Sequence, residues 1–405
     1  MVVLFMFKPK FFSILVIFLM VFSTVGSASA TITNTNDNKV VNDNKVIMMS
    51  NPTVKEIQKA VDCSNGRTIV IKGSPIDGGE INSTGVLHIK GEDCTFNNIH
   101  WNSMEDISFE GITFNNSHAD YGGAIHSEGY VTLTNCNFTE NSADTEGGAI
   151  WAKGIVVTNC SFNKNKCSGA HIMKCKGGVI YCDGGCVTIS GSNFTDNIAE
   201  DYGGVIYSSN STMVQKSVFE DNIAEDCGGV IYSDTDVYPV FISYSEFINN
   251  KASSDGGAIW AGREACIYDS ICTGNVATDC GGAIYSKHDV EVSDCSFDNN
   301  FVGNSSVFQC EGGAIYSDSD YVSINNSNFI DNFAYDDGGA VWSDGSVEVD
   351  GCSFVNNSAS GASVSQCEGG AIYSDSDGVN LINSNFTNNF AYDYGGAVWS
   401  DDGVT

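Results

Sequence analysis

The chain has 405 residues and carries 50 acidic against 18 basic residues, which gives a formal net charge of −32. A surface of this charge repels phosphate backbones, so nucleic-acid binding is excluded as a function, and docking on anionic lipid is disfavoured. With 44 glycines, 4 prolines and 42% hydrophobic residues, the chain is too apolar for a disordered acidic polymer. This composition predicts many short strands joined by turns.

The first 30 residues have the pattern of a signal peptide. Lys8 and Lys10 form a basic start, an apolar stretch occupies residues 11–25, and residues 28–30 (ASA) resemble a cleavage site. The apolar stretch is short for a bilayer span of about 20 residues, so we expect cleavage rather than an uncleaved membrane anchor. No later segment has the length of a span. The pattern therefore predicts an extracellular or cell-surface protein with no membrane span after signal removal.

Two short segments precede the main body of the chain. Residues 31–50 are rich in Asn, Asp and Thr and lack apolar periodicity, which predicts a flexible spacer. Apolar residues then recur at spacings of three and four over residues 54–61, as in a short amphipathic helix, and residues 68–71 (TIVI) predict a strand. We expect residues 51–93 to form an N-terminal cap, because a helix can cover the unpaired edge of a strand stack.

Residues 94–405 are built from a repeat. A Gly-Gly pair followed by Ala or Val, then Ile or Val, and then an aromatic residue or His occurs eleven times, at intervals of 25 to 31 residues. A second motif, Phe-x-x-Asn, falls between successive pairs, and two apolar columns spaced by two residues precede its Phe. This alternation predicts strands with one buried face. The first glycines of the pairs are Gly122, Gly147, Gly177, Gly203, Gly228, Gly256, Gly281, Gly312, Gly338, Gly369 and Gly395.

The repeat also decides the fold class. One unit of about 25 residues cannot bury its own apolar face, so neighbouring units must stack. Glycine pairs and β-branched residues argue against a helical solenoid, and a propeller blade needs about 40 residues. The predicted architecture is all-β: a single-stranded parallel β-helix with three short strands per coil and an uncapped C-terminus. We expect the Ile of the glycine motif and the Phe to point inward, and the Asn to lie at a turn where stacked amides bond along the axis.

The alternation of GGAIYS-like and FxxN motifs over residues 94–400 resembles the repeat of the chlamydial polymorphic outer membrane proteins. It is also similar to the repeats of adhesin-like surface proteins of methanogenic archaea. The resemblance implies a right-handed, pectin-lyase-like β-helix at the cell envelope or outer membrane, used in surface attachment. The implied partners are cell-surface glycans or proteins. The uncapped last coil adds end-to-end self-association as a hypothesis.

Catalysis is the main alternative, because the same fold also carries polysaccharide lyases and hydrolases. Lyase chemistry generally needs a strong base beside metal-binding carboxylates, and the chain has only two arginines, Arg67 and Arg263. Hydrolases need paired carboxylates in one cleft, whereas the acids here recur with the repeat. We therefore predict a non-catalytic adhesin-like protein. A structural cell-envelope spacer is the first alternative, and a lyase or hydrolase is the less favoured one.

An aromatic stripe is the candidate binding site. The residue after the inward Ile is aromatic in ten units, and strand alternation places it on the outer face. Exposed rings in a row bind sugar chains or partner proteins; the alternative is that they only cover the sheet or pack under loops. The stripe consists of Trp151, Tyr181, Tyr207, Tyr232, Trp260, Tyr285, Tyr316, Trp342, Tyr373 and Trp399.

The sixteen cysteines divide into two groups. Five of them stand two residues before the Phe, where other units have Ser, which predicts a buried ladder of small residues without disulfides. Cysteines near the Gly-Gly pairs, together with Cys182 and Cys186, are expected to pair in an oxidising setting, so Cys182 and Cys186 are the candidate disulfide. The absence of a CxxC motif argues against zinc.

Neither a metal site nor a cofactor is predicted. Calcium remains a hypothesis because acidic turns recur in successive coils, where stacked carboxylates repel unless a cation lies between them. The simpler interpretation is a solvated acidic edge. The acids concerned are Asp234, Asp236, Asp318, Asp320, Asp344, Asp375, Asp377, Asp401 and Asp402.

Overall fold

The computed structural model describes residues 41–43, 46–169, 175–303, 310–319, 321–361 and 367–405. All of them belong to a unit that spans residues 39–405. The predicted signal peptide, residues 1–30, lies outside the described residues, as do residues 31–40 of the predicted spacer. In the ranges that are described, no helix is both long enough and apolar enough to cross a membrane.

The described part begins with two strands. β1 (Val41–Asp43) pairs antiparallel with β2 (Val46–Ser50), and β2 pairs in parallel with β3 (Thr68–Lys72). Residues 41–43 and 46–50 of the predicted spacer are therefore strands. Ile47 and Met49 are buried in register with Ile69 and Ile71 of β3.

The predicted helix is α1 (Val54–Asp62), and its start is fixed by local hydrogen bonds. The Thr53 side chain accepts from the backbone N–H of Glu56, and the Glu56 carboxylate accepts from the backbone N–H of Thr53. This reciprocal arrangement is a capping box, which satisfies two donors that a helix start leaves free. The helix buries Val54, Ile57 and Val61.

The helix covers the open edge of β4 (Gly79–Ser83). The side-chain amide of Gln58 donates to the carbonyl of Asn82 and accepts from its N–H, both at 2.8 Å. Gln58 thus takes the place of a neighbouring strand at this edge, while β2 pairs with the neighbouring strand β3. The N-terminal end is closed by a helix and a strand together.

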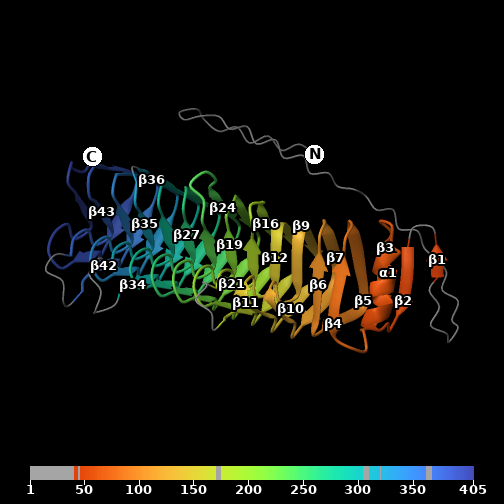
Figure 1. Cartoon of the computed structure of the whole chain (residues 1–405). Coiled ribbons are helices and arrows are strands. Elements are labelled where there is room, and N and C mark those ends of the chain that lie inside the picture. Colours follow the sequence, from red (N-terminus) through yellow and green to blue (C-terminus); the bar gives the residue numbers. More distant parts are fainter. Residues whose placement is uncertain (1–40, 44–45, 170–174, 304–309, 320, 362–366) are drawn as a thin grey trace, which may run out of the picture. The chain divides into compact units, whose positions relative to one another are not determined.

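From β6 onward the chain passes through four strand positions per coil, and each strand pairs in parallel with its counterpart in the next coil. The first three positions form one sheet and the fourth forms a separate sheet. Figure 1 shows the coils following one another in sequence order, from orange at the cap to blue near Thr405. The predicted parallel β-helix is confirmed, and the structure adds a fourth strand, mostly of two residues, to the three predicted per coil.

The first position, which follows the glycine pairs, continues from β4 with β6 (Ile99–Ser103), β9 (Ile125–Thr134), β12 (Ile150–Thr158), β15 (Ile180–Cys182), β19 (Ile206–Ser208), β23 (Ile231–Ser233), β27 (Ile259–Ala261), β31 (Ile284–Ser286), β35 (Ile315–Ser317), β39 (Val341–Ser343), β43 (Ile372–Ser374) and β47 (Val398–Ser400). β9 and β12 extend into the second position, which also contains β2, β3, β5 (Leu87–Asn97), β7 (Ile107–Asn115), β16 (Val187–Ser190), β20 (Thr212–Gln215), β24 (Val240–Ser243), β28 (Ala265–Tyr268), β32 (Val290–Ser293), β36 (Tyr321–Asn325), β40 (Ser346–Asp350) and β44 (Val379–Ile382).

β5 and β7 extend into the third position, which also contains β10 (Asn137–Thr139), β13 (Ser161–Asn163), β17 (Asn193–Thr195), β21 (Val218–Glu220), β25 (Glu246–Ile248), β29 (Ile271–Thr273), β33 (Ser296–Asp298), β37 (Asn328–Ile330), β41 (Ser353–Val355) and β45 (Asn385–Thr387). The fourth position contains β8 (His118–Tyr121), β11 (Ser142–Glu146), β14 (Lys166–Cys167), β18 (Ile198–Ala199), β22 (Ile223–Ala224), β26 (Lys251–Ala252), β30 (Val276–Ala277), β34 (Phe301–Val302), β38 (Phe333–Ala334), β42 (Ser358–Ala359) and β46 (Phe390–Ala391).

Columns of like residues fill the interior. The Ile of the glycine motif is fully buried in coil after coil, as Ile206, Ile231 and Ile259 show. The Phe rings stack along the axis with centroids 4.6–4.9 Å apart and planes within 10°, and Cys272 takes the place of one ring. Both inward columns are confirmed. The strand spacing of about 4.8 Å matches the distance at which rings stack.

The Asn of each Phe-x-x-Asn motif forms a second, polar ladder. Asn222 is fully buried; its Nδ2 donates to Oδ1 of Asn250 in the next coil at 2.9 Å and to the carbonyl of Phe194 in the preceding coil at 3.0 Å. The same pattern repeats from Asn141 to Asn357. The predicted bonding of stacked amides along the axis is therefore confirmed.

The two positions of each glycine pair require glycine for different reasons. The first glycine adopts a left-handed conformation, for example φ +64° at Gly203, where a Cβ would meet the carbonyl of Ile206. The second packs against the next coil: a Cβ on Gly204 would lie 2.1 Å from the carbonyl oxygen of Gly229. The first glycine makes the turn, and the second allows close stacking of the turns.

Candidate functional site

The ten residues of the predicted aromatic stripe form one column on the first strand position, paired in register from coil to coil. Their rings stack on one another with centroids 4.2–6.1 Å apart and planes within 18°. We call this column, from Trp151 to Trp399, the aromatic ladder.

The aromatic ladder is less exposed than an open stripe would be. Tyr207, Trp260, Trp342 and Tyr373 are 3%, 6%, 7% and 8% exposed, and the other six residues are half-buried. Because the coils repeat at about the thickness of a stacked ring, each ring covers the faces of its neighbours and leaves an edge free. Stacking a sugar on a ring needs a free face. The geometry therefore favours the alternative in which the rings cover the sheet, and binding of a ligand by the stripe stays a prediction.

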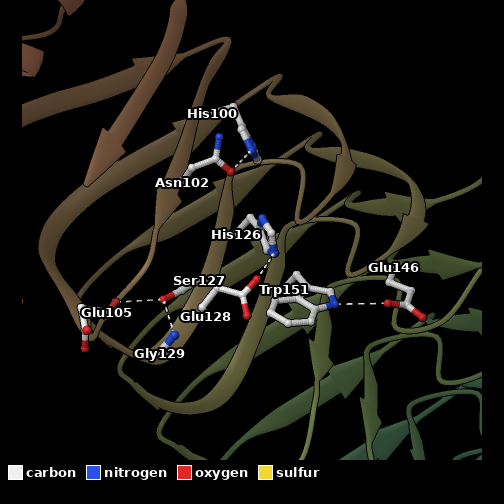
Figure 2. A network of polar contacts seen from close by, with 9 residues as sticks. All are labelled: His100, Asn102, Glu105, His126, Ser127, Glu128, Gly129, Glu146 and Trp151. Carbon is white, nitrogen blue, oxygen red and sulfur yellow. Dashed lines mark hydrogen bonds and ion pairs between the residues drawn. The ribbon is translucent and has the colours of Figure 1, made fainter. Parts of the chain in front are cut away.

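His126 extends the aromatic ladder at its N-terminal end (Figure 2). Its ring centroid lies 4.7 Å from that of Trp151, with planes at 78°, and its Nε2 lies 3.7 Å from the Glu128 carboxylate. Burial lowers the pKa of His126 in spite of Glu128, so the ring is neutral at neutral pH. The Trp151 Nε1–H donates to Glu146 at 3.1 Å. These contacts fix the orientation of the first rings.

Carboxylates line the free edge of the aromatic ladder. The Tyr207 hydroxyl donates to Asp234, and the Tyr373 hydroxyl donates to Asp375 at 2.9 Å. Burial, followed by the neighbouring carboxylate, raises the pKa of both tyrosines well above its ordinary value. The hydroxyls therefore remain neutral hydrogen-bond donors, and the edge of the ladder is a polar, acidic surface.

A shallow hollow of about 230 Å³ opens beside the aromatic ladder at Trp260. The Lys287 ammonium group lies 5.0 Å from the centre of the Trp260 ring, within the range of a cation–π contact. The hollow combines carboxylates, a cation, an imidazole and an aromatic edge, which suits a polar ligand held by hydrogen bonds. We call it the Trp260 hollow; its lining is Asp234, Thr235, Asp236, Trp260, Gly262, Lys287 and His288.

The sequence predicted only part of the Trp260 hollow. Trp260 belonged to the predicted stripe and Asp234 and Asp236 to the acidic turns, but Lys287 and His288 were not singled out. They follow β31, one coil after β27, which carries Trp260, and lie beside it only because the coils stack in register. The turn at residues 234–239 is longer than its counterparts in the coils before and after it, and this break in the repeat was the available signal.

The acids proposed as calcium ligands do not gather into a metal-binding group among the described residues, and Asp320 lies outside them. A different set does: Glu264, Cys266 and Glu291 place their ligand atoms within 4.8 Å of one another. Cys266 is 3% exposed, and burial raises the pKa of Glu264. A thiolate with two carboxylates suits Zn²⁺ better than Ca²⁺. These are the residues that could hold a metal, in a chain for which no metal site was predicted.

The cysteines of the predicted small-residue ladder, Cys94, Cys136, Cys160, Cys295 and Cys352, are all buried. The structure does not bring together the other predicted pair. Cys182 is buried and its thiol donates to the carbonyl of Gly185 at 3.0 Å, whereas Cys186 is exposed and contacts Asn210. Each thiol has its own partner, because Cys182 ends β15 and points inward, whereas Cys186 lies in the turn before β16 and faces Asn210 of the next coil.

A stack of parallel β-coils with in-register columns defines the chain as a β-helix repeat protein. Eight segments match the Chlamydia polymorphic membrane protein repeat: residues 135–153, 159–183, 216–234, 244–262, 269–287, 294–318, 351–375 and 383–401. The chain therefore carries the polymorphic membrane protein repeat eight times, and this repeat implies an outer-membrane or cell-surface protein. No curated protein and no solved structure matches the chain.

Proposed function

We propose that the chain is a non-catalytic, adhesin-like protein that is exported and binds glycans or proteins of other cells. The observation that carries the proposal is the Trp260 hollow, where a long turn and charged residues interrupt the repeat beside the aromatic ladder. The eight matches to the polymorphic membrane protein repeat support a surface location. A feature present in every coil supports the scaffold, whereas a feature confined to one place is better suited to recognition.

The lining of the Trp260 hollow indicates the kind of ligand. Asp234 and Asp236 are exposed acceptors, and Lys287 is an exposed donor whose ammonium group lies over the ring of Trp260. Paired acceptors and donors of this kind bind vicinal hydroxyl groups, and the aromatic edge contributes apolar contact. With a net charge of −32, the chain repels strongly anionic ligands. Neutral glycans therefore fit better than sulfated or phosphorylated ones.

The enzyme alternative concerns the same place. The hollow contains residue types used in acid–base chemistry, namely Asp234, Asp236, Lys287 and His288. Arg67, one of the two arginines that could have served as a strong base, has a structural role instead. Its guanidinium donates to the carbonyls of Cys63 and Ser64 at the end of α1. Incubation of the purified chain with the glycans that it binds separates the two functions. Release of shorter saccharides would identify a hydrolase or lyase and contradict the non-catalytic proposal.

Replacement of Lys287 or Asp236 by alanine is expected to weaken binding to target cells about ten-fold, because each removes a central polar contact worth about 1.4 kcal/mol. Binding of the full-length secreted chain is measured by titration on cells and on immobilised neutral glycans. The matched control is Lys251→Ala, which removes an exposed lysine from β26 in the other sheet. Equal binding by all variants would remove the Trp260 hollow from the proposal. Failure of the parent chain to bind any cell or glycan would favour a structural spacer.

A further inference from the structure

Two buried cysteines of one coil lie next to each other. Cys167, in β14, is fully buried, and Cys175, eight residues further on, is 1% exposed. The Cys167 thiol donates to the carbonyl of Thr145 at 3.2 Å, and the Cys175 thiol donates to the carbonyl of Asp144 at 3.5 Å. The acceptors are consecutive carbonyls of β11 in the preceding coil. Both thiols therefore reach the same short stretch of backbone, close enough for the Cys167 thiol to lower the pKa of Cys175.

The following coil holds the two cysteines from the other side. The backbone N–H of Glu200 donates to the carbonyl of Cys167 at 3.1 Å, and that of Asp201 donates to the carbonyl of Cys175 at 3.2 Å. The Asp201 carboxylate also accepts from the N–H of Cys175 at 2.6 Å. Hydrogen bonds to the preceding and following coils thus hold both cysteines in place, so the stacking of the coils sets the distance between the two thiols. Residues 170–174, between the cysteines, lie outside the described part of the chain.

Comparison along the fourth strand position shows that Cys167 is unusual. Cys167 pairs in register with Ala143 before it and Ala199 after it, and most further coils carry Ala in this column. A small residue suffices there for packing. In this column a cysteine occurs only in the coil that contains Cys175. Packing does not explain the presence of Cys167, whereas pairing with Cys175 does.

We propose that Cys167 and Cys175 form a disulfide in the exported chain and so close the long loop between β14 and β15. The proposal rests on the proposed surface location, because cytosolic thiol buffers keep such pairs reduced. A hydrogen bond from Cys167 lowers the pKa of Cys175, which makes Cys175 the attacking thiolate.

The reaction needs a disulfide oxidant, such as oxidised glutathione. The Cys175 thiolate attacks one sulfur of the oxidant, the S–S bond breaks, and one glutathione thiolate leaves. The Cys167 thiolate then attacks the sulfur of Cys175 and displaces the second glutathione. The chain loses two protons and two electrons in total, and the oxidant takes them up as two thiols.

The chain contains a matched control pair, Cys136 and Cys160. These two thiols also shift each other's pKa, but the backbone N–H of Cys136 donates to the Cys160 sulfur at 3.3 Å, and each thiol donates to a carbonyl of its own coil, at Thr134 and Thr158. Their side chains project in parallel from neighbouring coils about 4.8 Å apart, whereas a disulfide requires Cβ atoms within about 4.5 Å. We expect this pair to stay reduced under conditions that oxidise Cys167 and Cys175.

The test uses the purified full-length chain, first reduced and then equilibrated with oxidised and reduced glutathione. Free thiols are alkylated after acid quench and unfolding, and the peptides are identified by mass. We expect Cys167 and Cys175 in a linked peptide two hydrogens lighter than the reduced one, with Cys136 and Cys160 alkylated. In Cys167→Ala, which copies the neighbouring coils, Cys175 is expected as the alkylated thiol or the mixed disulfide with glutathione. Alkylation of both Cys167 and Cys175 in the parent chain, or linkage of either to another cysteine, would overturn the proposal.

The same peptide mapping on chain isolated from its own cells separates this inference from the proposed function. A linked pair there supports both the disulfide and the export of the chain. A pair that links in the glutathione buffer but is found reduced in the cell-derived chain supports the pairing and contradicts the surface location.

Discussion

Replacement of Asn332 by alanine is expected to lower the free energy of unfolding by about 3–5 kcal/mol, one of the largest effects of any single substitution in this chain. Asn332 is 1% exposed, and its Oδ1 accepts from both the backbone N–H and the side chain of Asn300 at 3.0 Å. Its Nδ2 donates to Asn357 and to the carbonyl of Phe297. Alanine would leave several of these buried groups without a partner, at about 1–3 kcal/mol each.

The effect is measured by chemical denaturation followed by circular dichroism, with Asn328→Ala as the control. Asn328 lies four residues before Asn332, in β37, and is exposed, so its replacement is expected to change the free energy of unfolding by less than about 0.5 kcal/mol. Equal stability of the two variants would mean that the amide ladder contributes little. The comparison isolates the ladder because both variants remove an asparagine side chain from the same coil, and only Asn332 belongs to the ladder.

Raising the pH from 5 to 9 is expected to destabilise the chain by an amount on the order of 3 kcal/mol. Glu311, Asp337 and Glu368 immediately precede glycine pairs in successive coils and stack along the axis, as the backbone bonds of the following glycines show. Burial, reinforced by neighbouring carboxylates, raises the pKa of Glu311 to about 8 and that of Asp337 to about 7. Burial likewise raises the pKa of Glu368.

The direction of the effect follows from proton binding. Between the unfolded pKa of about 4 and the folded values near 7 and 8, the folded chain holds protons that the unfolded chain has lost. Stability therefore falls as the pH rises through this window, and the contribution is lost completely above pH 8. At low pH both states are protonated and the column carries no penalty.

The matched experiment compares Tm against pH for the parent chain, for Glu311→Gln combined with Asp337→Asn, and for Glu225→Gln. The double variant removes the buried ionisations and is expected to flatten the curve and to raise Tm at pH 9. Glu225 is exposed, so its replacement is expected to leave the slope unchanged. Parallel curves for all three chains would assign the pH dependence to the general negative charge of the surface instead.

The repeat explains why so much of the fold was predictable. In a β-helix the neighbour of every residue is its counterpart one coil away, so a column such as Phe194, Phe219 and Phe247 is visible as a period in the sequence. The inward Ile, the stacked Phe and the buried Asn were predicted for this reason, and all are confirmed. The helix α1 was predicted from local periodicity, because its capping box and apolar spacing lie within a few residues.

The features that the sequence analysis assigned wrongly or did not identify depend on contacts that do not recur from one repeat unit to the next. β2 was assigned to a spacer because the Asn- and Asp-rich composition of the preceding residues outweighed its own apolar run, VIMM, which pairs with β3. Lys287 and His288 approach Trp260 only through the stacking of separate coils, and Cys175 approaches Cys167 across a loop of irregular length. In each case the contact joins residues that no repeated spacing relates.

The aromatic ladder illustrates which properties the amino-acid sequence determines and which ones depend on the tertiary structure. The amino-acid sequence by itself determined which residues form each column and which side of the strand they take, because alternation and the repeat length are properties of the chain alone. Only the tertiary structure decided how much of each ring meets solvent, which side chains surround it and which thiols touch. Those properties depend on the distance between coils and on the path of the turns, and neither is encoded in the order of residues within a single coil.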